Sequence, residues 1–284
     1  MRDPAIQISI LSIKSWLFTP GTRPDLFPRA GETGAGALVI DLEDSVATAD
    51  KITARRNSLD YLAAKSSNHI PCALRINPPD TECGELDLQS LLASSVTADF
   101  LVLPKCESPH TVHRISEALT LAGKPARIIA LIETIAGIRA LDQMAEGDPR
   151  PDAFLFGAAD MAADLGATTE WEPLLFARSR AIMAAAGSGI PAIDAPYFNI
   201  ADQDGLQKEV TAARNLGFHG KCAIHPSHIA IINSTFTPSA DDIARARRVI
   251  AASQHGVAQV DGRMVDAAFL RSARAILARA GIVV

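Results

Sequence analysis

Residues 127–134 read Arg-Ile-Ile-Ala-Leu-Ile-Glu-Thr, an apolar run that ends in a carboxylate and a hydroxyl. The run has the length and the unbroken apolar character of a strand that is buried on both faces. Residues 134–144, which follow, carry apolar side chains at helical spacing, and residues 153–157 form the next short apolar run. A buried strand, a helix and a second buried strand in this order predict a parallel sheet.

The same alternation extends in both directions from this stretch. Further candidate strands lie at residues 16–19, 37–41, 72–77, 100–104, 191–194 and 221–225. Helical spacing is found between most of them, for example at residues 110–121, 172–186 and 203–216. Eight βα units in sequence predict a TIM (β/α)₈ barrel, and a chain of 284 residues with 48% hydrophobic composition is long enough to form one.

A doubly wound α/β sheet is the main alternative, because it also alternates strands with helices. Its usual mark is a glycine-rich turn directly after the first strand, where phosphates bind. In this chain the segment Gly31-Glu-Thr-Gly-Ala-Gly36 precedes a strand instead of following one. Its glycines are therefore more typical of the end of a helix than of a dinucleotide site.

The chain continues beyond the eighth predicted strand. Residues 241–253 and 266–280 have helical spacing, and a linker containing Gly256 and Gly262 separates them. A complete barrel does not need this tail. We therefore expect a catalytic barrel domain at residues 1–236 and a C-terminal helical extension at residues 237–284, which could cap the active site of a neighbouring subunit.

Composition argues against several kinds of partner. Lys and Arg total 27 against 32 Asp and Glu, a formal net charge of −5, so there is no overall positive field to hold a nucleic acid. The longest apolar runs fall far short of the roughly 18 residues that cross a bilayer, and residues 1–14 lack the pattern of a signal peptide. The four cysteines show no CxxC spacing and are expected to be reduced. We expect a cytoplasmic protein with neither nucleic-acid nor membrane partners.

Polar side chains stand at the ends of most of the predicted strands. They are Asp41, Glu43, Asp44, Arg75, Asn77, Lys105, Glu133, Asp160, Asp194 and His225. One such residue is usually a turn former or a helix cap. Because barrel enzymes carry their chemistry at the carboxyl ends of the strands, so many on one rim predict an active site.

Two carboxylates on this rim suit a magnesium ion. Glu133 and Asp160 each follow an apolar strand, and the two strands are neighbours in sequence. Mg²⁺ commonly takes one or two protein carboxylates and completes its octahedron with water and substrate. The alternative is that Glu133 pairs with Arg75 or Arg139 and that Asp160 caps the following helix.

Arg75 is the cation of this rim with two possible roles. It could bind a substrate carboxylate with both prongs of its guanidinium, or stabilise the negative charge of an enolate. It could instead form a structural ion pair with Asp41 or Glu43. The sequence leaves both roles open.

The segments that carry these residues also form a pattern as a set. Three of them read Val39-Ile-Asp-Leu-Glu-Asp-Ser-Val46, Leu131-Ile-Glu-Thr-Ile-Ala-Gly137 and Gly217-Phe-His-Gly-Lys-Cys-Ala-Ile-His-Pro226. Others lie at residues 17–24, 49–51, 74–78, 103–105, 156–166, 191–194 and 261–266. In this order, over nearly the whole chain, they resemble the citrate lyase β-subunit-like family of the HpcH/HpaI aldolase superfamily, which includes citryl-CoA, malyl-CoA and citramalyl-CoA lyases.

The resemblance implies a Mg²⁺-dependent carbon–carbon lyase that cleaves or condenses a 3-hydroxy-carboxyacyl-CoA, with acetyl-CoA and a 2-keto acid as the other side of the reaction. It implies that Glu133 and Asp160 are the Mg²⁺ ligands and that Arg75 binds the substrate. It also implies that Asp266 is the catalytic carboxylate and reaches the active site of an adjacent subunit. We therefore expect a homo-oligomer, with a trimer favoured.

Further residues take roles by the same resemblance. Phe18, Arg23 and Lys51 are expected to bind the thioester and the coenzyme, beside Arg75 and Glu133. The residues expected to support the site by orienting other groups are Asp41, Glu43 and Lys105. One position departs from the family, which commonly has Gly-Ala-Glu-Asp where this chain has Gly157-Ala-Ala-Asp160.

Two other functions are compatible with the same residues. One is a metal-dependent aldolase that acts on free 2-keto acids without coenzyme A. The other is a non-catalytic subunit that binds an acyl thioester within a larger lyase complex. The presence of Glu133, Asp160, Arg75 and Asp266 together favours an active acyl-CoA lyase over both.

Overall fold

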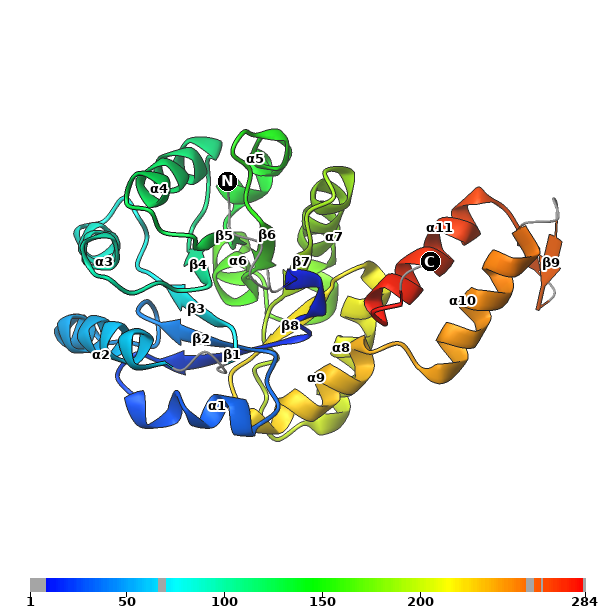
Figure 1. Cartoon of the computed structure of the whole chain (residues 1–284), viewed down its shortest axis with the longest axis horizontal. Coiled ribbons are helices and arrows are strands. Elements are labelled where there is room, and N and C mark those ends of the chain that lie inside the picture. Colours follow the sequence, from blue (N-terminus) through cyan, green and yellow to red (C-terminus); the bar gives the residue numbers. More distant parts are fainter. Residues whose placement is uncertain (1–8, 66–69, 254–257, 262, 283–284) are drawn as a thin grey trace. The chain divides into compact units, whose positions relative to one another are not determined.

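The structure is a computed structural model that describes residues 9–65, 70–253, 258–261 and 263–282. The chain divides into two compact units, Met1–Ile232 and Asn233–Val284. Among the described residues of the first unit, eight parallel strands close into a barrel in sequence order, and helices lie around the outside of the strands (Figure 1). The predicted TIM barrel is therefore confirmed.

The barrel strands lie close to their predicted positions. They are β1 (Ser15–Pro20), β2 (Ala37–Asp41), β3 (Cys72–Arg75), β4 (Phe100–Leu103), β5 (Arg127–Ile132), β6 (Ala153–Phe156), β7 (Ala192–Asp194) and β8 (Gly220–Ala223). Each strand pairs in parallel with the next, and β1 pairs with β8 to close the barrel, with Trp16 opposite Cys222.

The barrel interior is filled by alternate residues of the strands. Inward-facing side chains that pack together include Trp16, Val39, Phe100, Val102, Ile129, Leu131, Leu155, Ile193 and Cys222. The rings of Trp16 and Phe100 meet edge to face, with centroids 5.2 Å apart. Because this interior is closely packed below the rim, side chains at the carboxyl ends of the strands are held on a rigid base.

Some helices of the first unit begin at a side chain that caps them. The helices of this unit are α1 (Arg29–Glu32), α2 (Lys51–Ala64), α3 (Glu82–Ala93), α4 (Pro109–Leu121), α5 (Ile135–Glu146), α6 (Ala158–Leu165), α7 (Trp171–Gly187), α8 (Gln203–Leu216) and α9 (Ile229–Phe236), the last of which continues into the second unit. Thr134 caps α5 by accepting the N–H of Gly137, and Asp202 caps α8 by accepting the N–H of Gly205. No helix in the described ranges is both long and apolar enough to cross a bilayer.

The second unit contains more than the two predicted helices. Its elements are α10 (Ala240–Ser253), β9 (Ala258–Val260), β10 (Arg263–Val265) and α11 (Ala267–Arg279). The two short strands form an antiparallel hairpin where the sequence predicted only a linker, and Gly256 and Gly262 themselves lie outside the described residues. A small core of Ala246, Val249, Val265, Ala273 and Leu277 joins the helices to the hairpin.

Candidate active site

A pocket of about 410 Å³ lies at the carboxyl ends of the barrel strands. Charged side chains from β2, β3 and the segments after β2, β5 and β6 line it, namely Asp41, Asp44, Arg75, Glu133 and Asp160. Most of the remaining lining is apolar and includes Phe18, Leu131, Leu155, Phe156, Ala158, Ala159, Pro196, Phe198 and Ile224. The barrel topology thus brings the two predicted metal ligands and Arg75 to one cavity.

Glu133 follows the last residue of β5 and is buried, with 2% of its surface exposed. Its Oε1 accepts the backbone N–H of Lys105 at 2.8 Å. Its Oε2 lies against Gly157, where an added Cβ would approach to 2.6 Å. Glycine is therefore required at position 157, because any side chain there would displace the Glu133 carboxylate.

Asp160 lies in the first turn of α6, directly after β6. It is not the cap of that helix, because the N-cap position is occupied by Gly157, which has no side chain to cap the helix. The Asp160 carboxylate instead lines the pocket, with Oδ2 at 3.8 Å from Lys105 Nζ. Of the two alternatives for Asp160, the structure therefore disfavours the helix cap.

The Glu133 carboxyl lies in an environment that disfavours its charge. Burial raises its pKa to about 8, and the nearby carboxylates of Glu43 and Asp160 act in the same direction. Burial also raises the pKa of Glu43, although Arg75 and Lys105 oppose the shift. This end of the pocket therefore gathers carboxyl groups whose charged forms are disfavoured by burial and by one another.

Arg75, the last residue of β3, is held by a bidentate ion pair. Its Nε and Nη2 donate to the two oxygens of Asp41 at 2.6 and 2.7 Å, and its Nη1 lies 2.8 Å from Glu43 Oε2. The guanidinium also lies 5.1 Å from the centre of the Phe18 ring. Burial alone would raise the pKa of Asp41, but the hydrogen bonds from Arg75 hold it below its usual value. Asp41 thus occupies both prongs of the Arg75 guanidinium. This is the ion pair that the sequence had left open as one of two roles for Arg75.

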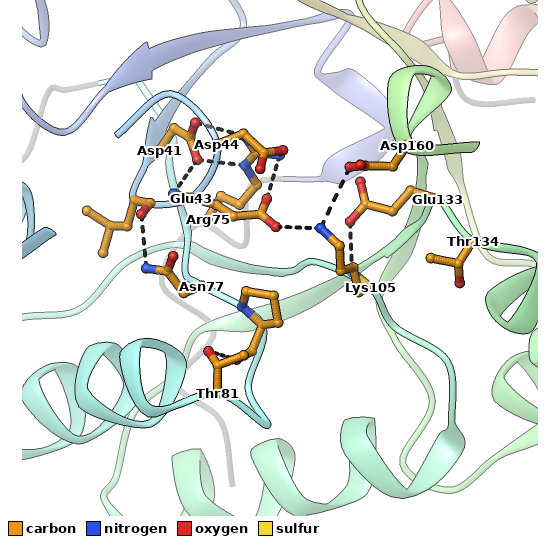
Figure 2. Close-up of polar contacts among 12 residues, drawn as sticks. Asp41, Glu43, Asp44, Arg75, Asn77, Thr81, Lys105, Glu133, Thr134 and Asp160 are labelled. Carbon is orange, nitrogen blue, oxygen red and sulfur yellow. Dashed lines mark hydrogen bonds and ion pairs between the residues drawn. The ribbon is translucent and has the colours of Figure 1, made fainter. Parts of the chain in front are cut away.

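Lys105 joins this ion pair to the two carboxylates. Figure 2 shows its ammonium between Glu43 and Asp160, with its backbone beside Glu133. The sequence assigned it a supporting role, and its contacts place it at the centre of the charged residues.

Other predicted residues lie away from the pocket lining. Arg23 is half exposed and pairs with Asp25 at 2.8 Å. Lys51, at the start of α2, donates from Nζ to the backbone oxygens of Leu42 and Glu43 at 2.7 Å each, and so fixes the loop after β2. Asp266 belongs to the second unit, and its Oδ1 caps α11 by accepting the N–H groups of Ala268 and Phe269.

Asp194 and His225 are among the residues expected on the rim that do not line the pocket. Asp194, at the end of β7, is fully buried between Arg178 of α7 and Lys221 of β8. His225 accepts the N–H of Ser227 and so begins a short 3₁₀ helix at Pro226–His228. Both side chains serve the local structure around them.

Sequence reasoning missed part of the pocket. Pro196, Phe198 and Ile224 line it from the segments after β7 and β8. They are apolar and were given no role, although Ile224 lies within the segment at residues 217–226. Only the partial exposure of Phe198 and Ile224, at 41% and 39%, distinguishes them from core residues. A second hollow of about 540 Å³ shares Phe18, Thr19, Pro20 and Ile224 with the pocket, so the cavity has room to extend past β1 and β8.

Most of the chain matches known protein families. Residues 14–226 match the family described as HpcH/HpaI aldolase/citrate lyase. The chain belongs to this family. Residues 173–283 also match a family described as C–C bond lyase of the TIM-barrel fold. This match runs from within α7 through β7, α8, β8 and α9 into the second unit.

Individual relatives are similar over nearly their whole length. Citrate lyase subunit beta of Haemophilus influenzae is 33% identical, over 94% of this chain and 96% of that protein. L-malyl-CoA/beta-methylmalyl-CoA lyase of Rhodobacter capsulatus is 32% identical, over 93% of each. The structure of CitE from Mycobacterium tuberculosis in complex with magnesium, acetoacetate and coenzyme A is 32% identical with a TM-score of 0.81, and covers 97% of this chain and 100% of that one.

Proposed function

We propose that this protein is a magnesium-dependent carbon–carbon lyase that cleaves, or in reverse forms, a 3-hydroxy-carboxyacyl-CoA. The products of cleavage are acetyl-CoA and a 2-keto acid. The observation that carries the proposal is the pair Glu133 and Asp160 at the pocket of a barrel of the aldolase/citrate lyase family. The substrate class is supported by a relative that is named a malyl-CoA lyase and by a structural relative solved with magnesium and coenzyme A.

The charges at the pocket fit a divalent cation. Glu133 is buried and repelled by Glu43 and Asp160, and a cation between Glu133 and Asp160 would offset that repulsion. In the described part of the chain, no three His, Cys, Asp or Glu side chains group closely enough to form a complete protein cage. Mg²⁺ needs no such cage, because it commonly binds one or two carboxylates and completes its shell with water and substrate. When bound there, Mg²⁺ would supply Lewis acidity toward the oxygens of the substrate.

The remaining requirements of the reaction fall to the chain itself. Cleavage removes the proton of the 3-hydroxyl, breaks the bond between C2 and C3, and moves that electron pair into a thioester enolate, which takes up a proton to become acetyl-CoA. Arg75 is fixed by Asp41 and Glu43, so its positive charge is already oriented when charge develops on the enolate oxygen. Because Asp41 fills the fork, Arg75 would act on the substrate through its charge and its remaining N–H groups.

The pocket lining bears on which acyl group is used. Citryl, malyl and citramalyl thioesters differ at C3, which carries a second carboxylate arm, a hydrogen or a methyl group. The described cations around the pocket, Arg75 and Lys105, already pair with carboxylates, whereas Phe198 and Ile224 offer apolar contacts. A second carboxylate would therefore be costly to bind. We infer a preference for citramalyl or malyl thioesters over citryl thioesters.

Turnover by the purified chain tests this function. The chain should release pyruvate from citramalyl-CoA or glyoxylate from malyl-CoA in the presence of Mg²⁺, and oxaloacetate from citryl-CoA more slowly. Glu133→Gln and Asp160→Asn should each abolish release, and Lys65→Met, which removes a charge beside Asp99 before β4, is the matched control. Cleavage of free 2-keto acid aldols without any thioester would instead support the aldolase alternative. Thioester binding without turnover would support the non-catalytic subunit.

Asp266 is proposed as the acid/base residue of a neighbouring subunit, in a homo-oligomer that we expect to be a trimer. It lies in the second unit, and its carboxylate is exposed. We propose that this unit is the C-terminal extension, from residue 237 onward. Asp266→Asn is the informative variant, because asparagine also caps helices and α11 should persist without the charge.

Mixing two inactive variants would then distinguish a shared site from a separate one. Subunits carrying Glu133→Gln, exchanged with subunits carrying Asp266→Asn, should recover part of the activity, because some sites would combine an intact rim with an intact tail. If mixed oligomers form and no activity returns, Asp266 does not act across subunits.

A further inference from the structure

Lys105 contacts three carboxylate groups at the proposed metal site. Its Nζ lies 3.2 Å from Glu43 Oε1 and 3.8 Å from Asp160 Oδ2. Its backbone N–H donates to Glu133 Oε1 at 2.8 Å. Figure 2 shows this residue between the Arg75 ion pair and the two proposed metal ligands. A single side chain and its backbone therefore join both halves of the charged rim.

The backbone of Lys105 is held in an unfavourable conformation. Its φ is 47°, and among the described non-glycine residues a positive φ recurs at Asp261. An L side chain in the left-handed region costs free energy and persists where surrounding contacts over-determine it. Here two hydrogen bonds from consecutive residues do so, Lys105 N–H to Glu133 and Cys106 N–H to Leu131 O at 3.1 Å. The turn thus fixes the backbone position from which the Lys105 side chain extends.

The position of the ammonium conflicts with a bound divalent cation. An ion on Glu133 and Asp160 would share the Asp160 carboxylate with Lys105 and place two more positive charges a few Å from it, where like charges repel. The Lys105 side chain is 38% exposed, whereas that of Glu43 is 5% exposed. The ammonium can therefore leave Asp160 through solvent without disturbing the buried carboxylates, and Glu43 remains available to it.

We propose that Lys105 is a positioning residue that acts as the counter-cation of these carboxylates before metal binds and withdraws from Asp160 toward Glu43 when it does. This inference rests on the metal site proposed above. It predicts that the ammonium opposes Mg²⁺ binding, while the turn that carries it supports the geometry of Glu133.

Direct titration of the metal-free full-length protein with MgCl₂, followed by calorimetry, tests the inference without any substrate. Lys105→Met removes the charge and keeps much of the stem, and it should bind Mg²⁺ roughly tenfold more tightly, as expected for loss of one nearby charge at a partly exposed site. Lys105→Arg keeps the charge and should bind like the unaltered protein. Lys65→Met removes a charge at the opposite end of the barrel strands, beside Asp99, and should also leave the affinity unchanged.

The possible outcomes are distinct. A Lys105→Met affinity equal to or weaker than that of the unaltered protein overturns the inference and leaves the metal site standing. Absence of Mg²⁺ binding by the unaltered protein, or binding that survives Glu133→Gln, overturns the proposed metal site itself and the inference with it.

Thermal unfolding gives a second measurement. Without Mg²⁺, Lys105→Met should unfold at a lower temperature than the unaltered protein, and saturating Mg²⁺ should remove the difference. A deficit that persists in Mg²⁺ would show that Lys105 is merely structural.

Discussion

Two groups of charged side chains stand near the ends of barrel strands, and they differ in charge balance. The first surrounds Asp194, whose oxygens lie 2.9 Å from Arg178 Nε and 2.5 Å from Lys221 Nζ, while Lys221 also lies 2.7 Å from Glu209 Oε1. Two cations thus face two carboxylates, and the side chains of Arg178, Asp194 and Lys221 are fully buried. Although burial acts to raise the pKa of Asp194, Lys221 and Arg178 hold it below its usual value.

The second group surrounds the pocket and is not balanced. Among the described residues there, Arg75 and Lys105 face Asp41, Glu43, Asp44, Glu133 and Asp160. The pKa of Glu133 is raised to about 8, the opposite direction to that of Asp194. Buried charges that are matched make the fold depend on each partner, because removing one leaves the other uncompensated. Unmatched carboxylates at a cavity are suited to a cation that arrives from solution.

Breaking the balanced group should have the largest effect on stability. Asp194→Asn would leave Arg178 and Lys221 buried without a full counter-charge, and we expect a loss of about 3–5 kcal/mol in the free energy of unfolding. Urea unfolding measures it. Asp44→Asn, at a carboxylate whose side chain is 60% exposed, should change the same quantity by less than about 0.5 kcal/mol. Equal effects of the two substitutions would contradict the distinction.

Arg75→Lys should cost less stability but more activity. Lysine cannot reproduce the two-pronged contact with Asp41, so we expect a loss of about 2 kcal/mol and a fall in kcat of roughly 10²-fold or more. Arg178→Lys removes the corresponding contact in the balanced group and is the matched control. It should destabilise the protein while leaving the kcat of the folded fraction near normal. A comparable loss of kcat in both variants would assign Arg75 a structural role.

At Lys105, glycine should give a more stable protein than alanine does, whereas within a helix the order should be reversed. Both Lys105→Gly and Lys105→Ala lose the ammonium, but only glycine adopts a φ of 47° without strain. The glycine variant should be more stable by about 1 kcal/mol. At Lys208, an exposed position within α8, the glycine variant should instead be less stable than the alanine variant by about 0.5–1 kcal/mol. The difference between the two pairs isolates the backbone from the charge.

Much of the fold was predictable because apolar runs and helical spacing alternate so regularly. The bounds of β2 and β5 were predicted without error, while the strands expected to reach Asn77 and Pro104 end earlier, where the chain turns onto the rim. The hairpin of β9 and β10 was missed because strands of three residues are too short to show a period of two. Helix α6 was missed because it adds a second helix between β6 and β7, where the predicted repeat has one.

The candidate site was predictable only as far as topology determines it. Parallel strands in a barrel end on one rim, and this brings Glu133, Asp160 and Arg75 to one pocket whatever the details of packing. Which rim residues face the pocket depends on where each strand ends, and for that reason Asp194, although it ends a strand as predicted, does not line the pocket. The partner chosen by Arg75 depends on side-chain geometry, and the position of Lys105 depends on one backbone angle. Neither the partner of Arg75 nor the position of Lys105 can be read from the spacing of residues in the sequence.

Replacing a carboxyl of the unbalanced group should have the smallest effect on stability, and any effect should have the opposite sign. Glu133→Gln keeps an oxygen that can accept the N–H of Lys105, so the turn should persist, but it replaces a carboxyl whose charged form is disfavoured by burial and by Glu43 and Asp160. In metal-free buffer we expect the free energy of unfolding to stay the same or rise by up to about 1 kcal/mol. The unaltered protein should in addition gain stability with increasing Mg²⁺, because a ligand that binds only the folded state stabilises it, and the variant should lose that gain. Urea unfolding with and without Mg²⁺ measures both effects on the same samples. A variant that is clearly less stable than the unaltered protein in metal-free buffer would show that Glu133 is a balanced structural charge like Asp194, and the contrast between the two groups would fail.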